Sequence, residues 1–275
     1  LELCATQDIT WLPGVPTMFI AWSNVDAEHA PRSLRWCLSA GAPLPEDVRL
    51  RAEARLGAPV RQGYGLTEAN LTAINAPPDE AVAGCCGKPV AGVEVLIADE
   101  AGTALPRGAH GEVLVRGQNV MSGYFGDKLA TAHVMRGGWL HTGDVGFLDE
   151  AGRLTIAERS KDLIERGGDS IYTSEVEDVL ARHPAVRDVA VVGQEDGYYG
   201  EVVVAVVALE NDVTARELDA WSRERLAPYK LPLRYAFVEA LPRGPSGKML
   251  KRRLRDQIAA GELAMETLPR HRPAQ

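Results

Sequence analysis

Cysteine is scarce in this sequence, and its spacing suits neither a metal site nor a disulfide framework. The four cysteines are Cys4, Cys37, Cys85 and Cys86 in a chain of 275 residues. Zinc sites use pairs of ligands separated by about two to four residues, and a chain of this length can bury a sufficient core without disulfides. We therefore expect free thiols and a reducing, cytoplasmic location.

Long apolar segments are also missing. The longest uninterrupted apolar run is Val202 to Leu209, whereas a membrane-spanning helix needs about 18 residues. No basic and apolar leader opens the chain, which argues against a secretory signal. The sequence therefore predicts no membrane span.

Basic and aromatic residues are too few for a nucleic-acid surface. The chain has 30 Lys and Arg against 38 Asp and Glu, a net charge of −8, and only 6% aromatic residues. Nucleic-acid binding needs a basic surface or aromatic residues interleaved with basic ones, and the excess of basic residues is confined to 241–275. With 45% hydrophobic residues, the composition is that of a globular protein rather than a disordered or fibrous one.

Three patterns follow one another along the chain. Residues 1–88 alternate strand-like and helical runs, including a helix from Pro45 to Leu56, which is typical of an α/β layer. Residues 89–158 alternate short strands with glycine turns. We predict the end of a large α/β domain, then a β-rich subdomain shaped as a distorted barrel, then an α+β C-terminal domain over residues 163–275.

Three helix starts are predicted in the last region. Two are capping boxes, in which a hydroxyl and a carboxylate three residues apart bond backbone N–H groups of the first turn: Ser174 with Glu177, and Thr214 with Glu217. A final helix follows Lys248, with its basic residues expected on solvated faces. Its apolar residues at four-residue spacing are Leu250, Leu254 and Ile258.

The segment 61–68 collects polar groups at the end of a predicted strand, where open α/β sheets bind ligands. Tyr64 offers a ring for a purine, Thr67 a hydroxyl for a phosphate, and Glu68 a carboxylate for Mg²⁺. The two glycines that flank Tyr64 let a backbone approach a flat ligand. The same pattern also fits a structural strand-turn-helix junction with Thr67 or Glu68 near the helix start.

Two further polar segments combine glycine with charged residues. In residues 141–146, Asp144 is placed to accept hydrogen bonds from the two hydroxyls of a ribose, although a purely structural turn fits as well. Residues 158–162 separate two patterns, as a hinge does, and Arg159 there is either a ribose or phosphate contact or part of a charged linker. The pair Gly167–Gly168 permits a turn or the passage of a thin ligand.

A loop rich in proline and glycine, residues 241–248, presents Lys248. It is not a Walker phosphate loop, because Pro242 stands in place of the first glycine and Met249 replaces the Ser or Thr. A lysine in such a loop either supplies a positive charge to a reacting carboxylate and phosphoryl group or is a surface residue before a helix.

In their order along the chain and their residue identities, these motifs resemble those of the adenylate-forming superfamily, which contains acyl-CoA synthetases, peptide-synthetase adenylation domains and luciferases. The resemblance covers nearly the whole chain. It is carried by Ser39-Ala40-Gly41-Ala42-Pro43-Leu44-Pro45, Tyr64 to Glu68, Gly111-Glu112 to Gly123-Tyr124, Thr142-Gly143-Asp144, Arg159-Ser160-Lys161-Asp162 and Ser246-Gly247-Lys248. The Arg-Ser-Lys-Asp segment followed by two glycines is most similar to the CoA ligases.

The resemblance implies an enzyme that joins a fatty or aromatic acid to ATP, with Mg²⁺, and then transfers the acyl group to CoA. It implies catalytic roles for Lys248, for Glu68 as the metal ligand, and for Thr67 at the phosphates. The nucleotide-binding residues implied are Gly63, Tyr64, Gly65, Asp144 and Arg159, with Gly41 and Tyr64 in the acyl pocket, Lys161 at a hinge over 159–162, and Gly167 and Gly168 along the CoA path.

Two departures from the family's pattern set limits on this expectation. The Ser, Thr and Gly-rich phosphate loop of the family is not found in these residues, and the chain starts at Leu1, so we expect a piece of a longer protein that adenylates poorly by itself. Glu158 and residues 169–173 also differ from the usual CoA-ligase pattern. An adenylation domain of a peptide synthetase and a non-catalytic nucleotide-binding fragment remain as alternatives.

Overall fold

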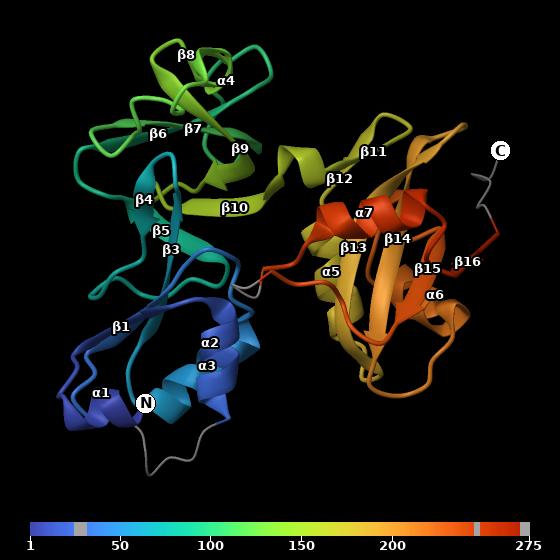
Figure 1. Ribbon diagram of the computed structural model, residues 1–275, viewed down its shortest axis with the longest axis horizontal. Coiled ribbons are helices and arrows are strands. Elements are labelled where there is room, and N and C mark those ends of the chain that lie inside the picture. The colour runs from blue at the N-terminus through green and yellow to red at the C-terminus, as the bar shows by residue number, and fades with distance from the viewer. Residues whose placement is uncertain (25–31, 245–247, 270–275) are drawn as a thin grey trace. The chain divides into compact units, whose positions relative to one another are not determined.

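The computed structural model describes residues 1–24, 32–244 and 248–269, and the chain divides into two compact units. Unit 1 is Leu1–Ala157 and unit 2 is Glu158–Gln275 (Figure 1). Each unit has its own sheet and its own hydrophobic core. This mixture of α/β and β-rich architecture with a separate α+β unit confirms the fold class expected from the sequence.

Unit 1 is organised around one large mixed sheet. Its strands are β1 (Trp11–Gly14), β2 (Trp36–Ser39), β3 (Val60–Leu66), β4 (Asn70–Ile74), β5 (Cys85–Pro89), β6 (Val93–Ala98), β7 (Gly111–Gly117), β8 (Met135–Arg136), β9 (Trp139–Leu148) and β10 (Leu154–Arg159). They follow the order β1-β2-β3-β4-β5-β10-β9-β7-β6, with β8 beside β9. The first three are parallel, and β3 with β4 begins the antiparallel part.

Four helices accompany this sheet in the described part of unit 1. They are α1 (Glu2–Thr6), α2 (Pro16–Ser23), α3 (Glu46–Leu56) and α4 (Lys128–Val134). The helix expected from Pro45 to Leu56 is confirmed as α3, with Pro45 at its N-cap. Helices α2 and α3 pack side by side (Figure 1) and bury Phe19 and Val48 in a cluster with Cys37 of β2.

The segment 61–68 leads into a hairpin, so the expected alternative of a helix start at Thr67 or Glu68 is wrong. Strand β3 continues to Leu66, residues 67–69 form a turn, and β4 starts at Asn70. Asn70 adopts a positive φ of 49°, a conformation that asparagine tolerates better than most residues and that tight turns use. The polar side chains of this segment therefore lie at a hairpin tip.

The expected boundary at residue 88 falls inside a continuous sheet. Strand β5 pairs with β4 on one side and with β10 on the other. Its neighbours thus come from both of the regions that the sequence pattern separates. The division of residues 1–158 into an α/β part and a β-rich part stays a prediction.

Unit 2 is an α+β unit. Its strands are β11 (Ile164–Arg166), β12 (Asp169–Ile171), β13 (Val186–Asp196), β14 (Gly200–Leu209), β15 (Arg234–Val238) and β16 (Met265–Thr267), and its helices are α5 (Thr173–Ala181), α6 (Ala215–Arg223) and α7 (Lys251–Ala259), with 3-10 turns at Ser160–Asp162 and Pro228–Lys230. Strand β14 lies between β13, to which it is antiparallel, and β15, to which it is parallel.

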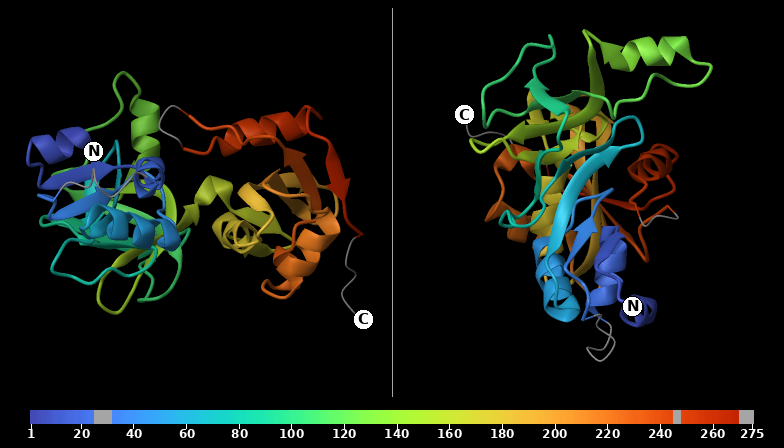
Figure 2. Two further views of the ribbon diagram at one scale, coloured as in Figure 1. Left: turned by 90° about the horizontal axis from the view of Figure 1, so that it is seen from below. Right: turned by 90° about the vertical axis from the view of Figure 1, so that its left-hand side faces the viewer.

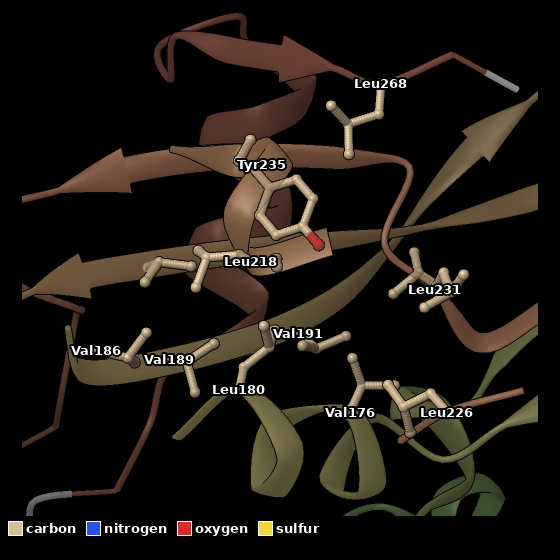
Figure 3. Packing of buried hydrophobic residues seen from close by; sticks show 14 of the residues in the cluster. Val176, Leu180, Val186, Val189, Val191, Leu218, Leu226, Leu231, Tyr235 and Leu268 are labelled. Atoms are coloured by element: carbon tan, nitrogen blue, oxygen red, sulfur yellow. The ribbon is translucent and has the colours of Figure 1, made fainter. Parts of the chain in front are cut away.

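Both faces of this sheet are covered, which explains why β14 is apolar along almost its whole length. Val203 and Val207 join a cluster with α5 and α6, which Figure 3 shows around Tyr235. Val204 and Val206 face the opposite cluster, which contains Leu254 of α7. Figure 2 shows α6 and α7 on opposite sides of the strands.

The two predicted capping boxes of unit 2 have different outcomes. The Thr214–Glu217 box is confirmed, because the Thr214 hydroxyl accepts from the Glu217 N–H and the Glu217 carboxylate accepts from the Thr214 N–H. The Ser174–Glu177 box is wrong. Helix α5 begins at Thr173 with Tyr172 at its N-cap, two residues before Ser174, and the Glu177 carboxylate accepts from the backbone N–H of Val191 instead, at 2.7 Å.

Candidate functional site

Asp144 lies in a bulge of strand β9. Between the register pairs Glu112 with Val145 and Leu114 with His141, three residues of β9 oppose one residue of β7. Gly143 has a φ of +66°, which a side chain would strain. A bulge redirects the side chains it contains, and here it turns Asp144 into the interior, where the residue is only 3% exposed.

The backbone of this bulge is fixed by Thr142. Its hydroxyl donates to the carbonyl oxygen of Val113 at 2.7 Å and accepts from the Asp144 N–H at 3.1 Å. The neighbouring Gly143 N–H donates to the Glu112 carboxylate at 3.2 Å. The contacts to Val113 and to Glu112 join β9 to β7, and the contact between Thr142 and Asp144 lies within β9, so the position of Asp144 follows from strand pairing together with the local bulge.

Tyr64 meets Asp144 across unit 1. The Tyr64 hydroxyl donates to Oδ2 of Asp144 at 2.5 Å, a distance typical of a phenol bonded to an ionised carboxylate. The ring is buried in the cluster that contains Ile97 and Val113. Two predicted site residues that are 80 positions apart in the sequence are therefore brought into direct contact.

Glu68 lies in the turn after β3, and the segment 119–124 holds that turn. The backbone oxygen of Glu68 accepts from the Met121 N–H at 2.7 Å, and its Oε1 accepts from the Tyr124 hydroxyl at 2.9 Å. The Asn119 amide donates to the carbonyl oxygen of Ala69. Thr67 is exposed in the same turn.

Tyr124 contacts one of the candidate site residues, Glu68, although the sequence did not single Tyr124 out. Gly123-Tyr124 contributes to the resemblance, but nothing in the local pattern pairs it with a carboxylate 56 positions earlier. The hydrogen bond to Glu68 raises the pKa of the Tyr124 hydroxyl. The only signal available was the occurrence of both residues in the quoted motifs.

The two glycines of β3 are packed closely against neighbouring protein atoms, so a side chain at either position would contact them. A Cβ at Gly65 would lie 2.1 Å from the carbonyl oxygen of Asn70, and one at Gly63 would lie 3.1 Å from the Leu38 side chain. Close packing within the hairpin therefore requires Gly65 whatever ligand is present. Gly41, exposed in the loop after β2, has only Val15 near its Cβ position, at 3.8 Å.

The predicted hinge residues lie at the start of unit 2, where helix α7 contacts them. Lys161 is exposed, and its backbone oxygen accepts from the Arg255 guanidinium at 3.1 Å. Arg255 also pairs with the buried Asp162 carboxylate at 2.6 Å. The Arg159 N–H donates to the Glu158 side chain at 3.1 Å.

The remaining predicted residues are exposed in turns of unit 2. Gly167 and Gly168 connect β11 to β12, and the Gly167 N–H donates to the Tyr199 carbonyl oxygen at 2.7 Å. Lys248 precedes α7, and its backbone oxygen accepts from the Gly244 N–H at 2.9 Å. Ser246 and Gly247 of the same motif lie outside the described residues. Lys248 belongs to unit 2 whereas Glu68 and Asp144 belong to unit 1.

Glu158 belongs to a polar cluster inside unit 2 that the sequence did not indicate. Its carboxylate accepts from the Thr173 hydroxyl and from the Ser174 N–H. Lys251 Nζ pairs with Glu177 at 2.9 Å and contacts the same Thr173 hydroxyl. The expectation that Lys251 lies on a solvated face is therefore wrong, because only 14% of its side chain is exposed.

Burial in this cluster raises the pKa of the Glu177 carboxyl to about 7. The positive charge of Lys251 and the hydrogen bond from Val191 oppose the shift, and the negative charge of Glu158 adds to it. The loss of hydration on burial has a larger effect on the pKa than the ion pair and the hydrogen bond together, so the net shift is upward.

The described residues contain neither a cluster of metal ligands nor a membrane-spanning helix. No group of three or more His, Cys, Asp or Glu side chains is arranged to hold a metal ion there. Mg²⁺ is commonly held by one or two carboxylates together with substrate phosphates, and the Glu68 carboxylate at the hairpin tip fits that donor set. No described helix is both long and apolar enough to cross a membrane.

Two family models match the chain along most of its length. A model described as AMP-binding enzyme matches residues 1–125, and a model of the AMP-binding enzyme C-terminal domain matches residues 175–248. The chain belongs to the AMP-binding, adenylate-forming enzymes. The family match therefore agrees with the resemblance drawn from the sequence motifs.

Relatives of this AMP-binding chain include CoA ligases. It is 41% identical over 263 residues to a long-chain-fatty-acid–CoA ligase of Bacillus subtilis (strain 168), a match that covers 94% of this chain and 47% of that protein. The chain thus spans about half the length of the curated relatives it matches.

Solved structures of AMP-binding relatives agree with this assignment. The o-succinylbenzoate CoA synthetase of Bacillus subtilis, in complex with its acyl-adenylate intermediate, is 36% identical with a TM-score of 0.81, and the match covers 92% of this chain and 52% of that one. The ATP-bound MatB protein of Rhodopseudomonas palustris is 33% identical with a TM-score of 0.86 over 90% of this chain and 50% of that one.

Proposed function

We propose that this chain is part of an AMP-forming acid–CoA ligase that acts on a fatty or aromatic carboxylic acid. The observation that carries the proposal is the buried Asp144 carboxylate, turned inward by a bulge and bonded to Tyr64. A buried carboxylate beside an aromatic ring suits the hydroxyls of a ribose. The relatives that match the chain supply the reaction class.

The proposed reaction has two steps. A carboxylate oxygen of the acid attacks the α-phosphorus of ATP, a P–O bond forms, and the bond to pyrophosphate breaks. The sulfur of CoA then attacks the acyl carbon, a C–S bond forms, AMP leaves with the bonding electrons, and the thiol proton passes to solvent. No oxidant or reductant is needed in either step.

Roles for the residues follow from their chemistry and from the resemblance. Asp144, Arg159, Gly63, Tyr64 and Gly65 would hold the adenosine, Thr67 a phosphate, and Gly41 with Tyr64 the acyl group. Glu68 would hold Mg²⁺, which neutralises phosphate charge when bound. Lys248 would stabilise the charge that develops between carboxylate and α-phosphate, Lys161 would be the hinge, and Gly167 and Gly168 would border the CoA path.

The test is thioester formation by the protein in the full length that its gene encodes. ATP, Mg²⁺, CoA and a panel of fatty and aryl acids are supplied, and thioester and AMP are quantified by mass spectrometry. Lys248→Ala should lower the ATP-dependent rate by about a hundredfold or more while thioester formation from a pre-formed acyl-adenylate and CoA persists. Lys128→Ala, an exposed lysine of α4, serves as the matched control.

The outcomes separate the alternatives. Equal amounts of AMP and thioester from a preferred acid would establish the ligase and its acid. AMP binding without release of pyrophosphate from any acid would instead support a nucleotide-binding protein. Transfer to a carrier protein but not to CoA would support a peptide-synthetase domain.

A further inference from the structure

We infer that Tyr64 is a positioning residue whose hydroxyl orients the Asp144 carboxylate toward a ribose diol, so that Tyr64 controls discrimination between ribose and deoxyribose. This inference rests on the proposed nucleotide-binding function. It assigns to the hydroxyl of Tyr64 a role separate from contact between its ring and a ligand.

The contact itself is suited to fixing the rotation of a carboxylate. A short hydrogen bond of 2.5 Å from the Tyr64 hydroxyl to Oδ2 is stronger than one between neutral groups. Asp144 is 3% and Tyr64 8% exposed, so water competes little for the bond. Turning the carboxylate would leave a buried hydroxyl and a buried oxygen without this bond, which is costly.

Both ends of the contact are held independently. The Tyr64 ring packs among Ile97, Val113 and other buried residues, and Tyr64 pairs with Ala73 in the β3–β4 ladder. The Asp144 backbone is held through Thr142. The hydroxyl therefore approaches the carboxylate from a fixed direction, and the direction of the carboxylate follows from it.

Fixed orientation matters for a ligand with two adjacent hydroxyls. A carboxylate binds a ribose diol well only if the carboxylate oxygens face the two O–H groups of the diol. A carboxylate that rotates freely before binding loses entropy when the diol binds. Removal of the Tyr64 hydroxyl should therefore weaken binding of nucleotides that carry the diol. It should have little effect on nucleotides that lack one of its hydroxyls.

The experiment is calorimetric titration of the protein, in the full length that its gene encodes, with AMP, 2′-deoxy-AMP and 3′-deoxy-AMP. We expect the native chain to bind AMP at least about tenfold more tightly than either deoxy analogue. Tyr64→Phe should weaken AMP binding by about five- to tenfold and leave the analogues within about twofold. Tyr229→Phe removes the hydroxyl of an exposed tyrosine in unit 2 and should leave the ratio between AMP and the analogues unaltered.

A second variant protects the test against a change in folding. Asp144→Asn should remove the preference for AMP, and the double variant Tyr64→Phe with Asp144→Asn should be no weaker than Asp144→Asn alone, because the two residues act through one contact. Additive losses would overturn the inference. So would an unchanged preference for AMP in Tyr64→Phe. If the full-length native protein does not bind AMP at all, the proposed function fails instead.

Discussion

The Glu177 carboxyl should make the stability of unit 2 fall as the pH rises toward neutrality. Glu177→Gln tests this, because the amide preserves the shape of the side chain and can still accept a hydrogen bond from Val191 and from Lys251. The amide cannot ionise, so the substitution removes one titrating group from the buried cluster and leaves its neighbours in place.

The size of the effect follows from the pKa. The pKa of Glu177 is about 7 in the folded protein against an ordinary value of 4.5. Because folding raises it, the stabilising contribution of the protonated carboxyl is fully present below pH 4.5 and is lost as the pH rises through about 7. At about 1.4 kcal/mol per pKa unit, the contribution should fall by about 2 kcal/mol between about pH 5.5 and about pH 8.

The assay measures urea unfolding of the whole chain after equilibration at each pH. A short hydrogen–deuterium labelling pulse at one common pH, followed by mass spectrometry, then reports the unfolded fraction from peptides of unit 2 alone. The free energy of unfolding of the native chain minus that of Glu177→Gln should decrease by about 2 kcal/mol from the lower to the higher pH.

A matched control lies on the same helix. Glu175 is 42% exposed and pairs with Lys230 at 2.5 Å, so Glu175→Gln removes a carboxylate from α5 outside the buried cluster and serves as the control. A difference between the native chain and Glu177→Gln that stays constant across this pH range would refute the assignment of a raised pKa to Glu177.

Two further predictions concern the backbone. Thr214→Ala should destabilise unit 2 by about 1 kcal/mol through loss of the hydroxyl that caps the Glu217 N–H. Urea unfolding should show that Thr214→Ser, which keeps a hydroxyl, recovers the stability. Equal stabilities of the native chain, Thr214→Ala and Thr214→Ser would contradict this prediction. Gly65→Ala should destabilise unit 1 by about 2 kcal/mol or more, because its Cβ would collide with the Asn70 carbonyl oxygen. Gly197→Ala, where a Cβ has open space, should differ little from the native chain in thermal unfolding, and equal losses at the two glycines would exclude the collision.

Local features of the sequence were predicted well where neighbouring residues decide the structure. The Thr214–Glu217 box formed because both partners lie in one helical turn, and α3 begins after Pro45 for the same kind of reason. The Ser174–Glu177 box has the same local pattern. It did not form because Val191 and Lys251, both distant in sequence, bind the Glu177 carboxylate.

The residues of the candidate site were recognisable from their motifs, but their contacts were not. Nothing in the sequence connects Tyr64 with Asp144, because their meeting depends on the order of strands in the sheet and on a bulge in β9. The same holds for Glu68 and Tyr124. The hairpin tip at Thr67 was missed because a hydroxyl and a carboxylate after a strand are equally typical of a helix start.

The position of β14 in its sheet has a consequence for the nascent chain. During synthesis, β13 and β14 can pair as soon as both have emerged, but Val204 to Ala208 on the second edge of β14 are paired only when β15 arrives, after α6 has been made. Until then Val204 to Ala208 form an unpaired apolar edge, the kind of segment that joins other chains into aggregates. A translation pause after β14 has left the ribosome and before β15 has left it would therefore expose an aggregation-prone strand edge.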